Sequence, residues 1–174
     1  MDHAELRALV RDVPDYPEDG VTFRDITPLL GHATGFGAAV DELVAMLDGV
    51  EVDRVIGVES RGFIFGAPVA HRIGAGFVPV RKPGKLPWAV VREEYDLEYG
   101  TDKLEIHRDA INHGERIAII DDVLATGGTA LATATLVETL GGVIAAMGFL
   151  IELEPLGGRS RLGERPVRSL LQYG

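Results

Sequence analysis

Two adjacent carboxylates, Asp121 and Asp122, stand between an apolar run at 117–120 and the sequence Ala-Thr-Gly-Gly-Thr at 125–129. The two glycines lack a Cβ, so the backbone there can curl and bring its N–H groups close to an anion. A helical pattern begins at Thr129, and the start of a helix points unpaired N–H groups and a positive dipole end at the same place. These features predict a cradle for a phosphate monoester.

The two carboxylates suit a different part of the same ligand. Asp121 and Asp122 would repel a phosphate, but they can accept hydrogen bonds from a vicinal diol such as the hydroxyls of a ribose. A Walker A loop would need a lysine beside the glycines, and a Rossmann fingerprint would need Gly-x-Gly-x-x-Gly after a strand; neither occurs here. The combination favours a ribose 5-phosphate site over a strand-to-helix turn with no ligand.

Two further groups of residues have the chemistry to bind anions. The chain has only three lysines, and Lys82 and Lys85 lie beside Arg81 in a stretch that contains proline and glycine. A phosphate site and a solvated charged turn both fit this cluster. The second group is Glu-Ser-Arg-Gly at 59–62, where Arg61 can offer its planar guanidinium next to backbone donors at the start of a helix.

The elements that would position these residues alternate between strands and helices. Apolar runs predict strands at 54–58, 77–80, 116–120, 143–153 and 169–173, and helical spacing predicts helices at 4–13, 34–47, 60–73 and 129–140. Such alternation indicates an α/β fold with a mostly parallel sheet flanked by helices. Ligands bind such sheets at the carboxyl ends of the strands, so the loops after Val58, Val80 and Ile120 should form the site.

Composition restricts the classes of protein. A chain of 174 residues without repeats or linkers predicts a single domain at 1–174. Its net charge of −10 argues against a general nucleic-acid or anionic-membrane binder. No apolar run reaches the ~18 residues of a membrane span, and the charged N-terminus does not resemble a secretory signal. The absence of cysteine is compatible with the cytoplasm, where we expect this protein, and the five histidines show no metal-ligand spacing.

The segment 117–129 resembles the binding motif of type I phosphoribosyltransferases for 5-phosphoribosyl-1-pyrophosphate (PRPP). The resemblance implies that Asp121 and Asp122 hold the ribose 2′- and 3′-hydroxyls. It also implies that the 5′-phosphate is wrapped by Ala125, Thr126, Gly127, Gly128 and Thr129.

Other segments are similar to adenine phosphoribosyltransferases, so the resemblance runs from about Tyr16 to Tyr173. Arg-Lys-Pro-Gly-Lys-Leu-Pro at 81–87 and Tyr-Asp-Leu-Glu-Tyr-Gly at 95–100 imply a flexible lid loop at about 81–103, although 88–94 follow no family pattern. The segment 20–28 is similar to the base-binding part of a small N-terminal hood, which would occupy about 14–31. The fold implied is the type I phosphoribosyltransferase fold.

The same resemblance implies individual roles. The 59–62 loop would grip pyrophosphate, with a cis peptide between Glu59 and Ser60, and Arg81 would reach pyrophosphate across a homodimer interface. Glu98 would accept the proton that leaves adenine N7, and Thr22 and Arg24 would contact the adenine edge. The implied catalytic residues are Glu98, Arg61 and Lys82, and the implied substrate-binding residues outside the 121–129 segment are Glu59, Ser60, Arg81, Lys85, Tyr99, Thr22 and Arg24.

The activity implied is transfer of the phosphoribosyl group from PRPP to adenine, giving AMP and pyrophosphate, with Mg²⁺ held mainly by PRPP, pyrophosphate and water. One alternative is a phosphoribosyltransferase for xanthine or hypoxanthine, whose 6-oxo group needs a donor where adenine needs an acceptor. Another is a PRPP-sensing regulator without catalysis. The chain has no room for an appended nucleic-acid-binding module and its charge is −10, which disfavours the regulator.

Overall fold

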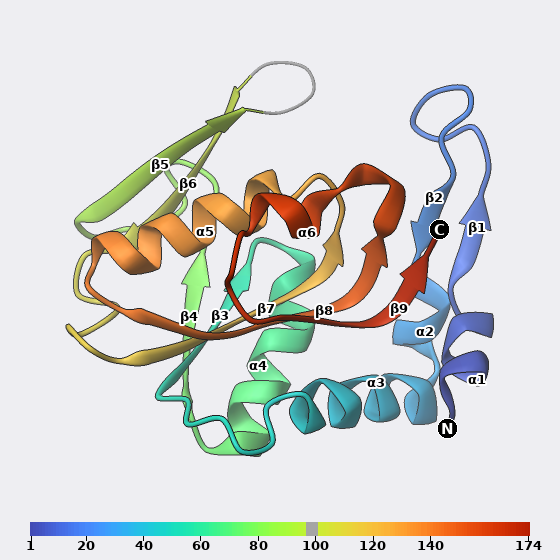
Figure 1. Cartoon of the computed structure of the whole chain (residues 1–174), viewed down its shortest axis with the longest axis horizontal. Coiled ribbons are helices and arrows are strands. Elements are labelled where there is room, and N and C mark those ends of the chain that lie inside the picture. Colours follow the sequence, from blue (N-terminus) through green and yellow to red (C-terminus); the bar gives the residue numbers. More distant parts are fainter. Residues whose placement is uncertain (97–100) are drawn as a thin grey trace. The chain divides into compact units, whose positions relative to one another are not determined.

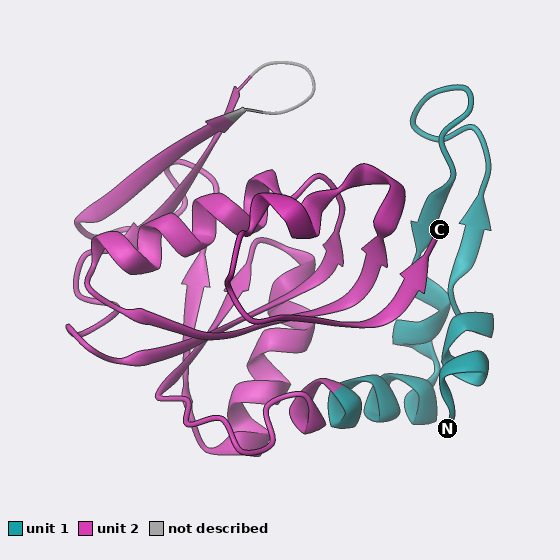
Figure 2. Cartoon of the chain, viewed as in Figure 1, with its two compact units in different colours: residues 1–42 teal, residues 43–174 magenta. Residues whose placement is uncertain are grey.

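A computed structural model of the chain describes residues 1–96 and 101–174 (Figure 1). The chain divides into two compact units, Met1–Glu42 and Leu43–Gly174 (Figure 2), and each is described by itself. None of the helices in residues 1–96 and 101–174 has the length and hydropathy that crossing a bilayer requires.

Unit 1 contains two short helices and a small antiparallel ribbon. Its elements are α1 (His3–Ala8), β1 (Arg11–Val13), β2 (Phe23–Asp25) and α2 (Thr27–Gly31), and α3 (Ala33–Ala45) begins in it. The predicted helix at 4–13 is wrong in its second half, because the chain leaves the helix after Ala8 and 11–13 pair with 23–25. Arg11 lies opposite Asp25 in that ribbon, so a cross-strand pair of opposite charges forms where the apolar spacing predicted a helix.

Unit 2 is built on a five-stranded parallel sheet, which confirms the predicted fold class. The strand order is β4-β3-β7-β8-β9, with bounds Gly76–Val80, Arg54–Val58, Arg116–Leu124, Val143–Leu153 and Val167–Tyr173. Helix α4 (Arg61–Ile73) covers one face of the sheet and α5 (Gly128–Thr139) covers the other (Figure 1). A short 3-10 turn, η1 (Glu154–Leu156), and α6 (Gly158–Arg161) connect β8 to β9.

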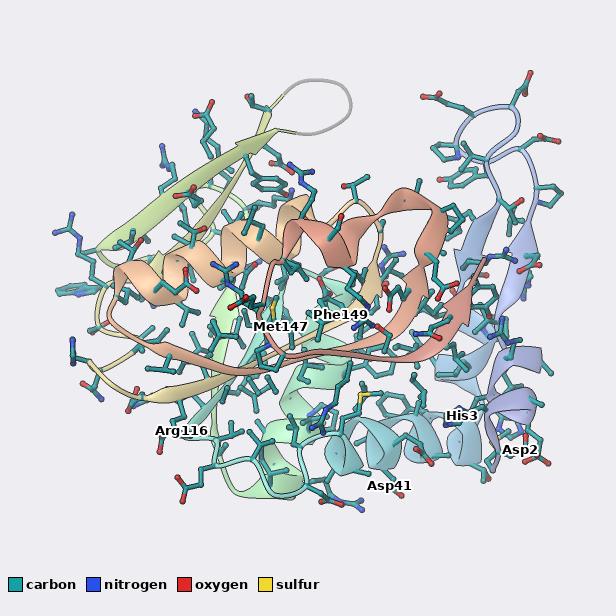
Figure 3. All side chains as sticks on the ribbon, viewed as in Figure 1. Asp2, His3, Asp41, Arg116, Met147 and Phe149 are labelled. Atoms are coloured by element: carbon teal, nitrogen blue, oxygen red, sulfur yellow. The ribbon has the colours of Figure 1, made fainter. Side chains whose placement is uncertain are left out.

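The hydrophobic core under α5 fixes the sheet on which the site depends. Met147 and Phe149, two residues apart on β8, are completely buried in it (Figure 3), as are Ile117 and Ile119 of β7. Alternate residues of a strand share a face, so these side chains meet α5 as one layer. Full burial of each aliphatic or aromatic side chain stabilises the fold by about 1.5–3 kcal/mol. The strand ends that carry the polar residues therefore stand on a well-packed core.

Strand β7 is longer than the sequence predicts. Its apolar run ends at Ile120, but its pairing with β8 continues to Leu124, which lies opposite Glu152. The length of β8 supplies a partner for these extra residues. As a result Asp121 and Asp122 are not in the loop after the strand but within the strand itself, where the ladder fixes their backbone.

The segment predicted as a lid loop at 81–103 contains regular structure. Strands β5 (Val90–Asp96) and β6 (Thr101–His107) form an antiparallel hairpin, whose register places Arg92 opposite Glu105 and Glu94 opposite Lys103. Opposite charges at these cross-strand positions stabilise that register. Leu104 and Ile106 of β6 are fully buried in the core under α5. The flexibility that the resemblance implies for this segment stays a prediction.

Candidate active site

The loops after β3 and β7 converge on one pocket of about 460 Å³ at the carboxyl ends of the strands. Its lining residues are Val58, Glu59, Ser60, Arg61, Asp121, Asp122, Val123, Ala125 and Thr129. The position agrees with the rule for parallel sheets, because neighbouring strands that run in the same direction bring their following loops together. Seven of the predicted site residues therefore share one pocket.

The two carboxylates are almost closed off from solvent. Asp121 is 9% exposed and Asp122 is 5% exposed. Asp122 Oδ2 lies 2.8 Å from Nε of Arg61, and the N–H of Asp122 donates to Asp121 Oδ1 at 2.9 Å. Gly62 makes room for this arrangement, since a Cβ there would lie 2.7 Å from Asp121 Oδ1.

Burial raises the pKa of both carboxyl groups and so disfavours their ionised forms. Burial, and then the charge of Asp122, hold the pKa of Asp121 well above its usual range. Burial also raises the pKa of Asp122, although the nearby guanidinium of Arg61 opposes that shift. Hydrogen-bond donors brought by a ligand would stabilise the ionised forms, which suits these groups to bind hydroxyls.

The loop between β7 and α5 forms a small hollow next to the pocket. Residues 123–130 line it, with a volume of about 70 Å³. Gly127 has φ +81°, a left-handed conformation that favours glycine, and a Cβ there would lie 2.6 Å from the carbonyl oxygen of Gly158. Helix α5 starts at the next residue, Gly128, so its free N–H groups face this turn. The geometry suits a phosphate group.

One support of this loop was missed in the sequence. A Cβ on Gly158 would lie 2.2 Å from the carbonyl oxygen of Ala125 and 2.9 Å from the nitrogen of Gly127. Arg161 Nη1 donates to the carbonyl oxygen of Thr126 at 3.4 Å. The start of α6 is thus packed directly against the loop. The paired glycines at 157–158 were a signal of close backbone approach.

The loop after β3 is hydrogen-bonded to the basic cluster at 81–85 that follows β4. The Glu59–Ser60 peptide is cis, as the resemblance implies. Arg81 Nε and Nη2 donate to the two carboxylate oxygens of Glu59 at 3.1 and 3.2 Å, and the N–H of Lys82 donates to Glu59 at 3.0 Å. The hydrogen bond from Arg81 lowers the pKa of Glu59, so this side chain is ionised near neutral pH.

The side chain of Lys82 meets the hairpin. Its ammonium is ion-paired with Asp102 and lies 6.0 Å from the ring centroid of Tyr95. The Tyr95 hydroxyl lies 3.2 Å from Asp102 Oδ2 and 3.2 Å from Thr129 Oγ1, so the hairpin contacts the phosphate loop. Tyr95 and Asp102 are not among the predicted site residues, although Tyr95 begins the 95–100 motif and Asp102 follows it by two residues.

The structure does not bring every predicted residue to the pocket. Lys85 is exposed and does not line it, and the carbonyl oxygen of Lys85 accepts from Arg81 Nη1 at 3.2 Å. Glu98 and Tyr99 lie outside the described residues. Thr22 precedes β2 in unit 1, and Arg24 within β2 is ion-paired with Asp12. The roles of these residues, like those of the residues in the pocket, stay predictions.

Comparison with known proteins identifies the family. A family profile described as "Phosphoribosyl transferase domain" matches residues 31–152. The adenine phosphoribosyltransferase of Roseiflexus castenholzii is 56% identical over 168 residues, which cover 97% of this chain and 98% of that protein.

Solved structures agree over nearly the whole chain. A crystal structure of adenine phosphoribosyltransferase from Thermoanaerobacter pseudethanolicus has a TM-score of 0.96 at 49% identity, and the match covers 98% of this chain and 99% of that one. The structure of the Saccharomyces cerevisiae enzyme has a TM-score of 0.91 at 40% identity, and the match covers 97% of this chain and 98% of that one. The chain therefore belongs to the adenine phosphoribosyltransferases, within the phosphoribosyltransferase family.

Proposed function

We propose that the pocket at the ends of β3 and β7 is where this chain transfers the 5-phosphoribosyl group of PRPP to adenine, giving AMP and pyrophosphate. The observation that carries the proposal is the shared pocket of Asp121, Asp122 and Arg61 beside the glycine turn at 125–129. A buried diol acceptor next to a phosphate cradle matches a ribose 5-phosphate. Among the relatives, the yeast enzyme was crystallised with D-2,5-dideoxy-2,5-imino-altritol 1,6-bisphosphate and adenine.

Each part of PRPP has a proposed place. The 5′-phosphate binds the N–H groups and hydroxyls of Ala125, Thr126, Gly127, Gly128 and Thr129. The ribose hydroxyls donate to Asp121 and Asp122. Pyrophosphate lies toward the 59–61 loop and the basic cluster, where the Arg61 guanidinium and the Lys82 ammonium supply positive charge.

The proposed reaction is displacement at ribose C1′, in which the C1′–N9 bond forms as the C1′–O bond to pyrophosphate breaks. Negative charge grows on the leaving pyrophosphate, and Arg61 and Lys82 stabilise it. Glu98 accepts the proton that leaves adenine N7, which makes N9 a better nucleophile. Thr22 and Arg24 hold the adenine edge, and the pocket walls keep base and ribose in line.

Mg²⁺ fits this pocket as a companion of the substrate. Among residues 1–96 and 101–174, no three His, Cys, Asp or Glu side chains are grouped to hold a metal ion, but Asp121 and Asp122 offer carboxylate oxygens at the pocket. Oxygen ligands are those that Mg²⁺ prefers, and it usually keeps phosphate oxygens and waters. When bound, Mg²⁺ would neutralise charge on the pyrophosphate oxygens.

The domain organisation, cellular location and oligomeric state of the protein are proposals as well. Residues 1–174 form one catalytic domain in which about 14–31 act as the base-binding hood, because the relatives align over nearly the whole chain. The protein is cytoplasmic and forms a homodimer. Sedimentation should give twice the mass of one chain, and a monomer that retains full activity would exclude the dimer as a requirement.

Pyrophosphate release tests the proposed function directly. With PRPP and Mg²⁺, we expect turnover with adenine and little with hypoxanthine, guanine or xanthine. The Glu98→Gln variant should bind PRPP as the parent does but lose about 10²–10⁴-fold in kcat, the usual contribution of a general base. Turnover with an oxo-purine but not with adenine would contradict the base assignment, and unchanged kcat in the variant would contradict the role of Glu98.

A further inference from the structure

Lys82 is paired with a carboxylate that the proposed reaction does not use. Asp102 of β6 forms an ion pair with the Lys82 ammonium, and the two side chains are 25% and 41% exposed. Burial raises the pKa of Asp102, but Lys82, the Lys103 N–H and Tyr95 outweigh it and leave that pKa below its ordinary value. Burial likewise lowers the pKa of Lys82, yet Asp102 and Tyr95 leave it raised. Both groups are therefore charged at neutral pH.

Asp102 is held in place without help from Lys82. Its Oδ1 accepts the N–H of Lys103 at 2.8 Å, and its Oδ2 accepts the Tyr95 hydroxyl at 3.2 Å. The Tyr95 hydroxyl in turn lies 3.2 Å from Thr129 Oγ1, which lines the pocket. If Lys82 moved away, this carboxylate would keep two hydrogen bonds and would not be left buried without a partner.

Lys82 is anchored at its backbone and free to change partner at its tip. The N–H of Lys82 donates to Glu59, a pocket residue, at 3.0 Å. Beyond that anchor the side chain is a flexible four-carbon stem with a compact charge. The ammonium can therefore exchange one anion for another while the main chain stays fixed.

We propose that Asp102 competes with pyrophosphate for the ammonium of Lys82. It pairs with Lys82 while pyrophosphate is absent, loses it to the pyrophosphate of bound PRPP, and recovers it as the product leaves. The proposal rests on the proposed role of Lys82 in binding pyrophosphate. The opposite arrangement, in which Asp102 merely orients Lys82 toward the anion, predicts a change of the other sign.

The test is the affinity for inorganic pyrophosphate, measured by calorimetry with Mg²⁺ at low ionic strength, where screening is weak. Asp102→Asn keeps the size of the side chain and removes its charge. We expect this variant to bind pyrophosphate about three- to tenfold more tightly, because a partly exposed ion pair is worth up to about 1 kcal/mol and a repelling charge is also lost. Equal or weaker binding in a variant that unfolds at the parent's temperature would overturn the proposal.

Two further variants separate this proposal from the role of Lys82. Glu94→Gln removes another ion pair of the same hairpin, Glu94 Oε2 with Lys103 Nζ at 2.8 Å, and should leave the affinity unchanged. Lys82→Met should weaken pyrophosphate binding and abolish the effect of Asp102→Asn in the double variant. If Lys82→Met changes nothing, the role of Lys82 fails; if it weakens binding while Asp102→Asn also weakens it, only the competition fails.

Discussion

At the scale of single residues, Asp121 shows how binding and stability oppose each other. Its carboxyl group is buried in the pocket wall, and the folded chain offers it the N–H of Asp122 but also the charge of that neighbour. A ribose diol would bring donors that stabilise the ionised form. In the ligand-free protein the same ionised group is a cost to folding.

Replacing Asp121 by Asn should therefore stabilise the free protein and impair the reaction. At pH 7 we expect unfolding to cost about 1 kcal/mol more, because the folded parent must either hold a poorly compensated buried charge or take up a proton to avoid it. The Tm should rise by about 2–4 °C per kcal/mol. The kcat/KM for PRPP should fall by about 10–100-fold, because a hydrogen bond to a charged acceptor is lost. Calorimetry and initial rates measure the two effects.

The pH dependence gives this prediction its sign. The pKa of Asp121 is higher in the folded chain than its ordinary value of 3.8, so the folded state keeps this proton to a higher pH than the unfolded chain does. The free energy of unfolding therefore falls as pH rises through the folded pKa. The advantage of Asp121→Asn should thus be present at pH 7 and disappear as pH falls below 3.8. A stabilisation that persists unchanged at low pH would mean that charge is not its cause.

At the scale of elements, the phosphate loop depends on a contact that its own sequence does not contain. Ala125 and Gly127 touch Gly158 at the start of α6, and no side chain fits between them. The glycines and threonines at 125–129 predicted the loop because their chemistry is local. The partner could not be identified from sequence, because its closeness depends on how β7 and β8 lie together in the sheet.

Gly158→Ala tests that contact. The new Cβ would lie 2.2 Å from the carbonyl oxygen of Ala125, so the phosphate loop must shift. We expect kcat/KM for PRPP to fall by about 10²-fold, the usual result of displacing a binding group by about 1 Å. Gly37→Ala is the control, since nothing lies within 4 Å of a Cβ there and the helix should gain up to about 1 kcal/mol. A Gly158→Ala enzyme with parental kinetics would show that the loop tolerates the shift.

The strands that sequence reasoning missed are those that pair with an antiparallel neighbour. The parallel strands could be predicted from their apolar runs, because both faces of a parallel sheet are covered. The β1–β2 ribbon and the β5–β6 hairpin carry charged residues whose purpose appears only when the opposite strand is known, as with Arg92 and Glu105. Glu105 is 2% exposed, which no pattern of apolar residues would predict.

At the scale of the whole molecule, the pocket that we propose to bind anions belongs to a chain of net charge −10. The fold class, the pocket position and most pocket residues were predictable, because strand–helix alternation and the 121–129 motif are both strong signals. The contact of Thr22 and Arg24 with the adenine edge stays a prediction that rests on resemblance alone, since these two residues carry no chemistry of their own that selects a base.

Acid stability should be set partly at the far end of the sheet from the pocket. Arg54 donates to both oxygens of Glu115 at 2.7 and 3.0 Å, and this hydrogen bond, followed by that of the Asn112 N–H, lowers the pKa of Glu115 to about 2. As pH falls, the Glu115 carboxylate is protonated in the unfolded chain before it is protonated in the folded chain. The stabilisation is therefore complete above pH 4.5 and is lost as pH falls toward 2.

Glu115→Gln should accordingly lower the free energy of unfolding at pH 7 by about 0.5–1 kcal/mol, after allowance for solvent screening. The deficit should narrow as pH falls below 4.5, where the parent loses the same interaction. Chemical denaturation across pH 3–7 measures both, and kcat should be unaffected. A deficit that stays constant with pH would assign the effect to packing and not to charge.

Strand β7 has hydrogen bonds that stabilise the fold at its first residue and the pocket aspartates near its last residues. Arg116 (Figure 3), whose N–H donates to Asp53 Oδ2 at 2.7 Å, begins the strand, and the paired aspartates lie near its finish. A protein engineer could therefore redesign the opening residues of β3 and β7 for heat tolerance without touching turnover. Natural selection has the same freedom, so we expect lineages adapted to different temperatures to diverge first at that margin of the sheet.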